Sequence, residues 1–270
     1  MKKTVEFEWG RKEDFFVREA YNTLRTNVLF CGRDVKVIVI TSCLDNEGKS
    51  TVSQGLAKGL ANNGERVLLL DADLRKSVFA VKAKAEGSIV GLSQVLSGQV
   101  AVDDAIYETN CKGLDMIFAG PFPPNPSEML AGKNFAALIS SLREEYDHII
   151  IDAAPLGLVV DASVIAGVCD GSILVVNRGQ IKSRTAQNVK KQLERSGCRV
   201  LGVVLNQTTR RNARSSYGYY YYSRYGRHAN YRYYRKNGYS YGYGYGYGYG
   251  AGSSDSTEKA EKAEKGKKGK

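Results

Sequence analysis

One short segment, residues 43–51 with the sequence C-L-D-N-E-G-K-S-T, carries the residue types best suited to chemistry. It lies between an apolar, β-branched run and a stretch with helical spacing. Backbone N–H groups of a tight loop and of a helix N-terminus converge on phosphate oxygens. In such a loop Lys49 reaches the β- and γ-phosphates of ATP, and the Ser50 hydroxyl ligates Mg²⁺. The residues expected to line the phosphates are Asp45, Asn46, Glu47, Gly48, Lys49, Ser50 and Thr51.

Two further apolar runs end in aspartate. Residues 67–70 lead into Asp71 and Asp73, and residues 149–151 lead into Asp152. The carboxyl ends of parallel strands meet at one edge of a sheet, beside the phosphate loop. Three carboxylates there can hold Mg²⁺, directly or through water, and one of them can accept a proton. Strand-end aspartates also cap helices, but this set beside a phosphate loop favours a catalytic role.

Short apolar runs alternate with helical patterns along the chain. The expected strands are residues 35–40, 66–70, 114–119, 148–151, 172–176 and 200–205. The expected helices are residues 15–31, 50–63, 91–96, 127–146, 161–166 and 183–196, with Ser127 capping its helix after the rigid, proline-rich turn 121–126. Strands that alternate with helices indicate βαβ units. The expected fold class is α/β, a P-loop NTPase-like, mostly parallel sheet with helices on both faces.

The last part of the chain differs from the rest in composition. Residues 1–209 carry 25 Lys and Arg against 24 Asp and Glu, a net charge of +1, whereas residues 210–270 carry 14 against 4, a net charge of +10. Fifteen of the 18 tyrosines lie in this second segment, separated by Gly, Arg and Ser. With almost no aliphatic residues, it buries too little area to offset the entropy of ordering its backbone. We therefore expect an ATP-binding domain at 1–209 and a disordered, basic, tyrosine-rich tail at 210–270.

Composition argues against several protein classes. The first ten residues have two lysines but no apolar core, so a secretory signal is not expected. The longest apolar runs span a few residues, whereas a membrane-spanning helix needs about 20. Five cysteines without CxxC or Cys/His pairing argue against a disulfide framework and a structural zinc site. We expect a cytoplasmic protein that reaches the inner face of the membrane only through a partner.

The three strand-end motifs together resemble those of bacterial tyrosine kinases. GKST resembles the Walker A motif, D-x-D-x-R at 71–75 the A′ motif, and D-x-x-P at 152–155 the Walker B motif. The stretch E-A-Y-N-T-L-R-T-N at 19–27, N-P-S-E-M-L at 125–130 and the tyrosine-rich tail are similar to that family as well. The resemblance covers about residues 15–207 and the tail. It is to the stand-alone cytoplasmic type, found with capsule or exopolysaccharide synthesis.

The chain departs from the family pattern at three places. Asp45 and Asn46 stand where the family usually has Pro-Gly, and the Walker B motif ends in Ala-Ala-Pro. A motif of one acidic residue and two arginines, tied to self-association in the family, reads here as Glu19, Asn22 and Arg25. One arginine is therefore missing.

The resemblance implies an ATP-dependent protein-tyrosine kinase that phosphorylates its own tail and regulates polysaccharide polymerisation and export. The implied catalytic residues are Lys49, Asp71, Asp73 and Asp152. Asp71 is the candidate base for a tyrosine phenol, and the implied Mg²⁺ ligands are Ser50, Asp73 and Asp152, with the aspartate roles open to exchange. The implied acceptors are Tyr217, Tyr219, Tyr220, Tyr221, Tyr222, Tyr225, Tyr231, Tyr233, Tyr234, Tyr239, Tyr241, Tyr243, Tyr245, Tyr247 and Tyr249. The implied partners are a membrane-embedded polysaccharide co-polymerase that activates the kinase, a cognate tyrosine phosphatase and further copies of the chain.

Three residues near the loop have two possible roles each. Arg75 is expected to bind phosphate, and pairing with a carboxylate is its alternative. Asn206, which ends the last strand, is expected to contact the adenine, as asparagines there do in related folds, and a plain turn residue is its alternative. Cys43 replaces the first glycine of the usual G-x-x-x-x-G-K-[ST] pattern, which raises the alternative of an oxidation-sensitive gate on ATP binding.

Two other functions remain open. A chromosome-partitioning or septum-placing ATPase has a similar fold, but it carries lysine where this chain has Leu44 and lacks an acceptor-rich tail. The interleaved arginines and tyrosines of the tail also suit stacking on single-stranded bases, which would make it a nucleic-acid-binding module. We do not expect nucleic acid as a partner, since the same composition describes a solvated array of phosphate acceptors.

Overall fold

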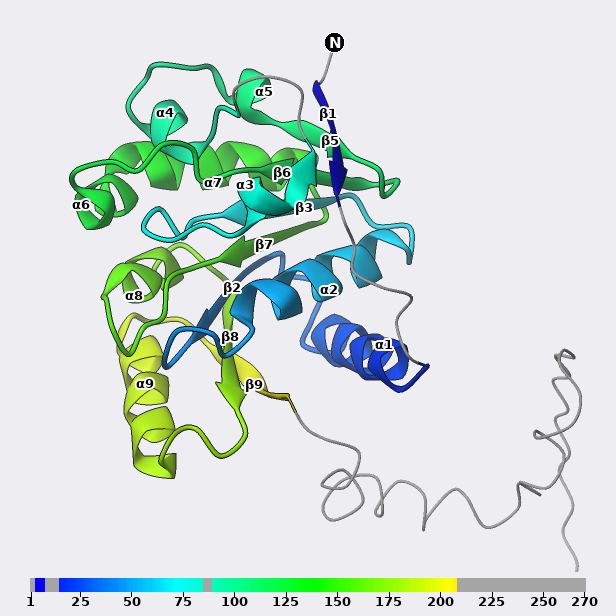
Figure 1. The fold of residues 1–270 in the computed structure, drawn as a ribbon, viewed down its shortest axis with the longest axis vertical. Coiled ribbons are helices and arrows are strands. Elements are labelled where there is room, and N and C mark those ends of the chain that lie inside the picture. The colour runs from blue at the N-terminus through cyan, green and yellow to red at the C-terminus, as the bar shows by residue number, and fades with distance from the viewer. Residues whose placement is uncertain (1–2, 8–14, 85–88, 208–270) are drawn as a thin grey trace, which may run out of the picture. The chain divides into compact units, whose positions relative to one another are not determined.

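A single nine-stranded sheet organises the described residues of the computed structural model, which are 3–7, 15–84 and 89–207 (Figure 1). Its strand order is β4-β1-β5-β6-β3-β7-β2-β8-β9. The strands are β1 (Lys3–Phe7), β2 (Val37–Ser42), β3 (Val67–Asp71), β4 (Ala83–Lys84), β5 (Tyr107–Thr109), β6 (Leu114–Ile117), β7 (His148–Asp152), β8 (Gly171–Asn177) and β9 (Val200–Asn206). The predicted tail at 210–270, with its tyrosines, and the predicted domain boundary at 209 lie outside the described residues.

Parallel pairing dominates this sheet, as predicted. Only β1 with β4 and β5 with β6 pair antiparallel. Every residue of the four central strands, β2, β3, β7 and β8, is buried. Strands covered on both faces are near-continuous apolar runs rather than alternating ones, which is why these four were recognisable from the sequence.

Helices cover both faces of the sheet. They are α1 (Phe15–Leu29), α2 (Lys49–Ala61), α3 (Phe79–Lys82), α4 (Leu92–Leu96), α5 (Val102–Ala105), α6 (Pro126–Ala131), α7 (Lys133–Glu145), α8 (Asp161–Ala166) and α9 (Ser183–Arg195). Along β2, Val37 and Val39 belong to a core that contains α6, α7, α8 and α9, whereas Ile38 and Ile40 belong to a core that contains α1 and α2. The two-residue period of a strand thus divides the apolar residues between two layers (Figure 1).

The structure corrects one predicted helix. Residues 127–146 form two helices, α6 and α7, separated at Gly132, whose backbone is extended at φ −71° and ψ 156°. Asn125 occupies the N-cap position of α6 and Pro126 its first turn. Ser127 therefore does not cap this helix; its hydroxyl bonds to a side chain outside the helix, that of Asp161. β1, β4, β5, α3 and α5, each of five residues or fewer, were not predicted.

The register of the sheet determines where the motifs meet. β3 and β7 are neighbours, with Asp71 directly opposite Asp152, and β7 also pairs with β2. The loops that follow these strands consequently leave the same edge of the sheet side by side. None of the helices in the described ranges has the length and apolar character needed to cross a bilayer.

Candidate active site

The phosphate loop joins β2 to the first turn of α2. Gly48 precedes the helix with a left-handed backbone, at φ 87°. A Cβ atom at this position would lie 2.0 Å from Nδ2 of Asn206, so only glycine fits. The first bond of this turn runs from the Val52 N–H to the Gly48 carbonyl, at 3.0 Å. The N–H groups before Val52 therefore have no intrahelical acceptor and are available to an anion, as the sequence predicts.

Glu47 anchors the loop from within. Its side chain is fully buried, and one carboxylate oxygen accepts hydrogen bonds from the backbone N–H groups of Cys43 and Leu44, each at 2.7 Å. The other oxygen accepts from the backbone N–H of Asn177 at the end of β8, at 3.0 Å. Three backbone donors thus satisfy this carboxylate, and only the backbone of Glu47 remains for a phosphate contact.

Lys49 lies between two aspartates. Its ammonium group is 2.7 Å from Oδ2 of Asp73 and 3.4 Å from Oδ2 of Asp152. Burial lowers the pKa of Lys49, but the charges of Asp152 and Asp73 outweigh it, so the net pKa is raised above its ordinary value. The amine therefore stays protonated, and a positive charge is held at the N-terminal end of α2.

Two serines of α2 hold Asp152. The Ser50 hydroxyl donates to one carboxylate oxygen at 2.6 Å, and the Ser53 hydroxyl donates to the other at 2.8 Å. Burial raises the pKa of Asp152, and Lys49 and the two serines oppose that shift without cancelling it. Because all of its partners are side chains, each can rotate away when another ligand arrives.

Asp71 lies in the interior, with no exposed surface. The Ser77 hydroxyl and the backbone N–H of Asp73 donate to it. Burial, followed by the charge of Asp152, raises the pKa of Asp71 to about 8. A carboxyl group with a pKa near neutrality is suited to exchange protons during a reaction.

Arg75 is paired with a carboxylate, which was its alternative role. Its Nε donates to Asp161 at 2.7 Å and its Nη2 donates to the other oxygen of Asp161 at 3.2 Å. The same Nη2 donates to Ser127 at 2.9 Å, and Ser127 donates to Asp161 at 2.6 Å. This cluster ties the segment after β3 to α6 and α8, and in this arrangement the guanidinium group is directed to Asp161.

The remaining predicted residues lie around the loop. Nδ2 of Asn206 donates to the Glu47 carbonyl at 3.0 Å, which places this side chain against the loop. Asp45 is at the exposed tip and pairs with Lys76 at 3.3 Å. Thr51 is exposed, and its carbonyl accepts from the Tyr21 hydroxyl at 3.1 Å.

Five residues of the site were not predicted: Ser53, Ser77, Asp161, Asn177 and Gln207. The last two end strands at the carboxyl edge of the sheet, or follow one directly, so the strand-end argument that found Asp152 would also have selected them. Ser53, Ser77 and Asp161 carry no such signal, because their roles depend on what lies across the fold.

The donor set fits Mg²⁺. Within the described ranges no group of three or more His, Cys, Asp or Glu side chains is arranged to hold a metal ion. The predicted set is two carboxylates and a hydroxyl, those of Asp73, Asp152 and Ser50. Mg²⁺ is commonly held by one or two carboxylates plus substrate phosphates, so this set is sufficient. The Lys49 ammonium held by Asp73 and Asp152 shows that these oxygens already stabilise a cation.

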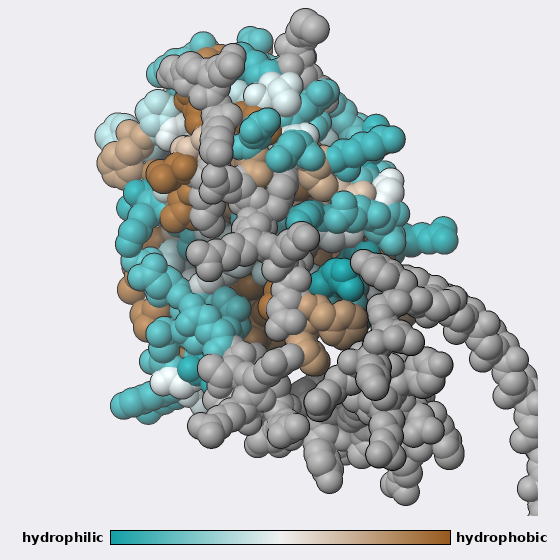
Figure 2. All heavy atoms as spheres, turned by 45° about the vertical axis from the view of Figure 1, so that its right-hand side comes forward, coloured by the Kyte–Doolittle hydropathy of each residue, from teal (hydrophilic) through white to brown (hydrophobic). Residues whose placement is uncertain are grey.

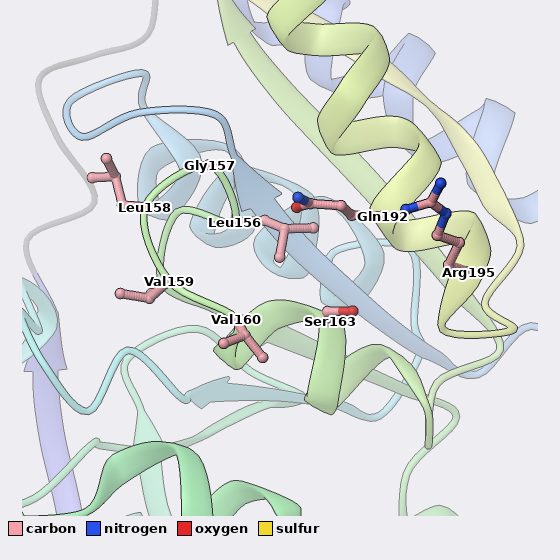
Figure 3. Close-up of a pocket in the computed structure, with 8 residues that line it drawn as sticks. All are labelled: Leu156, Gly157, Leu158, Val159, Val160, Ser163, Gln192 and Arg195. Carbon is pink, nitrogen blue, oxygen red and sulfur yellow. The ribbon is translucent and has the colours of Figure 1, made fainter.

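A hollow of about 430 Å³ lies beyond the Walker B motif. One side is the loop 156–160, and the other carries Gln192 and Arg195 of α9 (Figure 3). Gly157 of this loop packs against the Cys43 carbonyl, where a Cβ atom would come within 2.1 Å. None of the predicted site residues lines the hollow, so we assign it no part in the chemistry.

Comparison with known proteins identifies the family. Residues 35–191 match the AAA domain family. The chain is 44% identical over 191 residues to the tyrosine-protein kinase CpsD of Streptococcus agalactiae, an alignment that covers 71% of this chain and 82% of that protein. The fold is similar to the kinase domain of Escherichia coli tyrosine kinase ETK, with a TM-score of 0.69, 29% identity and coverage of 84% and 80%.

A more distant relative carries nucleotide. The septum site-determining protein MinD of Pyrococcus horikoshii, solved with Mg-ADP, is similar at a TM-score of 0.55 and 26% identity, over 66% of this chain and 73% of that one. The shared P-loop fold implies that this chain binds nucleotide. The identity shared with CpsD, 44% against 26%, decides between the two families. The chain belongs to the family of bacterial tyrosine-protein kinases.

Proposed function

We propose that this tyrosine kinase transfers the γ-phosphoryl group of ATP to tyrosines in its own C-terminal segment, residues 217–249. The observation that supports the active site most directly is the Lys49 ammonium between Asp73 and Asp152, at the helix end where the phosphate loop ends. A positive charge at this position neutralises charge on the transferred phosphoryl group, which is where most catalysis of phosphoryl transfer lies.

The reaction requires one bond to form and one to break. The phenolic oxygen of a tyrosine bonds to the γ-phosphorus, the bond from that phosphorus to the β–γ bridging oxygen breaks, and ADP leaves. The phenol has an ordinary pKa of about 10, so its proton must be accepted as the new bond forms. We assign Asp71 as the acceptor. Because Asp71 has no exposed surface here, the segment after β3 must move before a tyrosine can reach it.

Asp73, Asp152 and Ser50 are proposed to hold Mg²⁺. A metal held there would neutralise negative charge on the phosphates. Lys49 then gives up its contacts with the two aspartates and turns to the β- and γ-phosphates. Ser50 and Ser53 donate to Asp152 through their side-chain hydroxyls. These hydrogen bonds can therefore be exchanged for metal contacts without any change in the backbone.

The acceptor segment follows, in the sequence, a residue that contacts the phosphate loop. Gln207, the last described residue, bonds to the loop carbonyl of Asn46 at 3.3 Å. Tyr217 follows ten residues later, so it can lie at most about 35 Å from that contact along a fully extended chain. Tethering of this kind replaces a bimolecular encounter by a high effective concentration, either within one chain or toward a neighbouring copy.

We also propose that the chain associates with copies of itself. Large apolar side chains are exposed at both ends of α1, among them Phe15, Phe16 and Phe30, which is 83% exposed. Figure 2 shows several small apolar areas, separated by hydrophilic residues, on the face that it displays. In the motif tied to self-association, Arg25 donates to the Gly59 carbonyl of α2 at 3.4 Å, which is a contact within one chain. Because Arg25 has this partner, an assembly would need contacts from other residues as well.

The further partners are proposed from the family resemblance. They are a membrane-embedded polysaccharide co-polymerase that activates the kinase and recruits it to the inner face of the membrane, and a tyrosine phosphatase that reverses the modification. The process served would be capsular or exopolysaccharide polymerisation and export. Co-purification of the full chain with the cytoplasmic segment of such a membrane protein tests the first partner, and kinase activity unchanged by that segment would contradict it.

One experiment tests the central proposal. Purified full chain is incubated with ATP and Mg²⁺, and phosphotyrosine is located by peptide mass spectrometry. Phosphotyrosine is expected within residues 217–249, absent from Lys49→Met, and present in the control variant Lys58→Met on the same helix. ATP hydrolysis without phosphotyrosine would instead favour a positioning ATPase. Salt-sensitive RNA binding that disappears when residues 210–270 are removed would favour a nucleic-acid-binding tail.

A further inference from the structure

Two consecutive residues at the end of β9 hold consecutive carbonyl groups of the phosphate loop. Nε2 of Gln207 donates to the Asn46 carbonyl at 3.3 Å, and Nδ2 of Asn206 donates to the Glu47 carbonyl at 3.0 Å. Oε1 of Gln207 accepts from Nδ2 of Asn177 at 2.5 Å, which fixes the orientation of the glutamine amide. Asn177 is the same residue whose backbone N–H donates to Glu47.

The backbone is unusual at both ends of the Gln207 contact. Within the described ranges, Asn46 and Gln207 are the two non-glycine residues with a left-handed backbone, at φ 61° and φ 54°. This conformation is uncommon in residues other than glycine, and departures of this kind gather at functional sites. Here the two residues are hydrogen-bonded to each other, although 161 positions separate them.

Peptide planarity converts these contacts into phosphate-binding geometry. The carbonyl of one residue and the N–H of the next lie in one rigid plane and point in opposite directions. Fixing the Asn46 carbonyl therefore fixes the Glu47 N–H, and fixing the Glu47 carbonyl fixes the Gly48 N–H. Among the described residues neither N–H group has a hydrogen-bond acceptor, so both are available to an anion.

We propose that Gln207 is a positioning residue of the nucleotide site: through the Asn46 carbonyl it aims a loop N–H group at the phosphates, with Asn206 doing the same one residue later. The tyrosine-rich segment at 210–270 begins three residues after Gln207. Coupling between two sites is reciprocal, so the free energy by which the Gln207 contact favours phosphate binding equals the free energy by which bound nucleotide favours that contact. Bound nucleotide therefore stabilises the position of Gln207, from which the chain continues into the tyrosine-rich segment. Only this last step rests on the proposed function; the positioning of the loop does not.

The test uses the full chain and three variants. Gln207→Glu keeps an acceptor for Asn177 but replaces the donor to Asn46 by a carboxylate oxygen, and Gln207→Ala removes both contacts. Gln192→Glu, on the exposed side of α9, introduces the same charge elsewhere and is the matched control. Affinities for Mg-ADP and for adenosine are measured by calorimetry and ligand-observed NMR, together with the melting temperature.

Both Gln207 variants lose the hydrogen bond to Asn46, which predicts an ADP affinity about five- to tenfold weaker, with adenosine affinity and melting temperature unchanged. Amide hydrogen exchange at Glu47 and Gly48 is expected to be faster in the variants. ADP affinity equal to that of Gln192→Glu would overturn the proposal, and so would equal losses for ADP and adenosine or a lowered melting temperature. Because no phosphoryl transfer is measured, a failure of tail phosphorylation would not affect the outcome.

Discussion

Two kinds of buried carboxylate meet at the edge of this sheet, and they are held in opposite ways. Glu47 is satisfied by three backbone N–H groups, of Cys43, Leu44 and Asn177. Asp152 is satisfied entirely by side chains, those of Lys49, Ser50 and Ser53. Backbone donors cannot leave without unfolding the loop, whereas side-chain donors leave by a rotation.

Within one site, Glu47 therefore has a structural role and Asp152 a chemical one. Glu47 behaves as a permanent internal anion that shapes the loop before any nucleotide arrives. Asp152, together with Asp73, is an exchangeable anion, able to trade the Lys49 ammonium for another cation. We therefore predict that a substitution at Asp152 lowers mainly the activity, whereas a substitution at Glu47 lowers mainly the stability.

The largest effect is expected at Asp152, the carboxylate that is held by side chains. Asp152→Asn should lower the phosphotyrosine formation rate by about 100- to 1,000-fold, as loss of one electrostatic contact to a transition state does. The melting temperature should change little, because an asparagine still bonds to both serine hydroxyls. The control is Asp103→Asn on the surface of α5. A rate within tenfold of the unmodified chain would contradict the assignment of Asp152.

Glu47→Gln should show the opposite pattern. The amide nitrogen would face a backbone N–H donor, so the free energy of unfolding should fall by about 1–3 kcal/mol. The fall should be seen without nucleotide, in urea unfolding followed by circular dichroism. Glu144→Gln, an exposed change of the same chemistry, is the control. Stability equal to the control would show that Glu47 is not an internal anchor.

Arg75→Lys tests whether another buried carboxylate, that of Asp161, has a structural role like Glu47 or serves the nucleotide site. Asp161 is fully buried and accepts from two nitrogens of Arg75, Nε and Nη2, and a lysine cannot reproduce this two-point contact. We expect a loss of about 1–2 kcal/mol in unfolding free energy and an unchanged ADP affinity, with Arg184→Lys as control. An ADP affinity weakened tenfold with stability intact would instead assign Arg75 to phosphate.

The smallest effect is expected at Cys43. Its side chain has no exposed surface, and burial, followed by the charge of Glu47, raises the pKa of the thiol to about 11. Alkylation needs the thiolate and access to it, so Cys43 should react well after the partly exposed Cys31. Mass spectrometry after timed maleimide treatment measures this order. Rapid labelling of Cys43 that ADP blocks would restore the oxidation-sensitive gate.

The sequence predicted the elements whose signals are local. β2, β3 and β7 each contain an apolar run of three or four residues, and β3 and β7 end in Asp71 and Asp152. The helix boundary at Lys49 was placed within one residue, since the glycine before it marks the turn. By contrast, the break at Gly132 was missed, because apolar spacing continues through it into α7.

Local sequence patterns did not predict which groups the site residues contact. Arg75 could bind phosphate or a carboxylate on sequence grounds, and Asp161, 86 residues away, decided its geometry. Asn206 was expected at the adenine, and its amide lies on a carbonyl 159 residues earlier. Such contacts depend on which strands become neighbours in the sheet.

The sequence by itself therefore determined that this chain has a phosphate loop, a parallel sheet and three aspartates at its carboxyl edge. These follow from residue spacing and from the rule that parallel strand ends share an edge. Only the tertiary structure decided which carboxylates are held by the backbone and which by side chains. It also decided that Asn206 and Gln207 donate hydrogen bonds to the loop. The physical reason is that hydrogen bonds between segments 100 or more residues apart are selected by packing of the whole sheet, which no local pattern encodes.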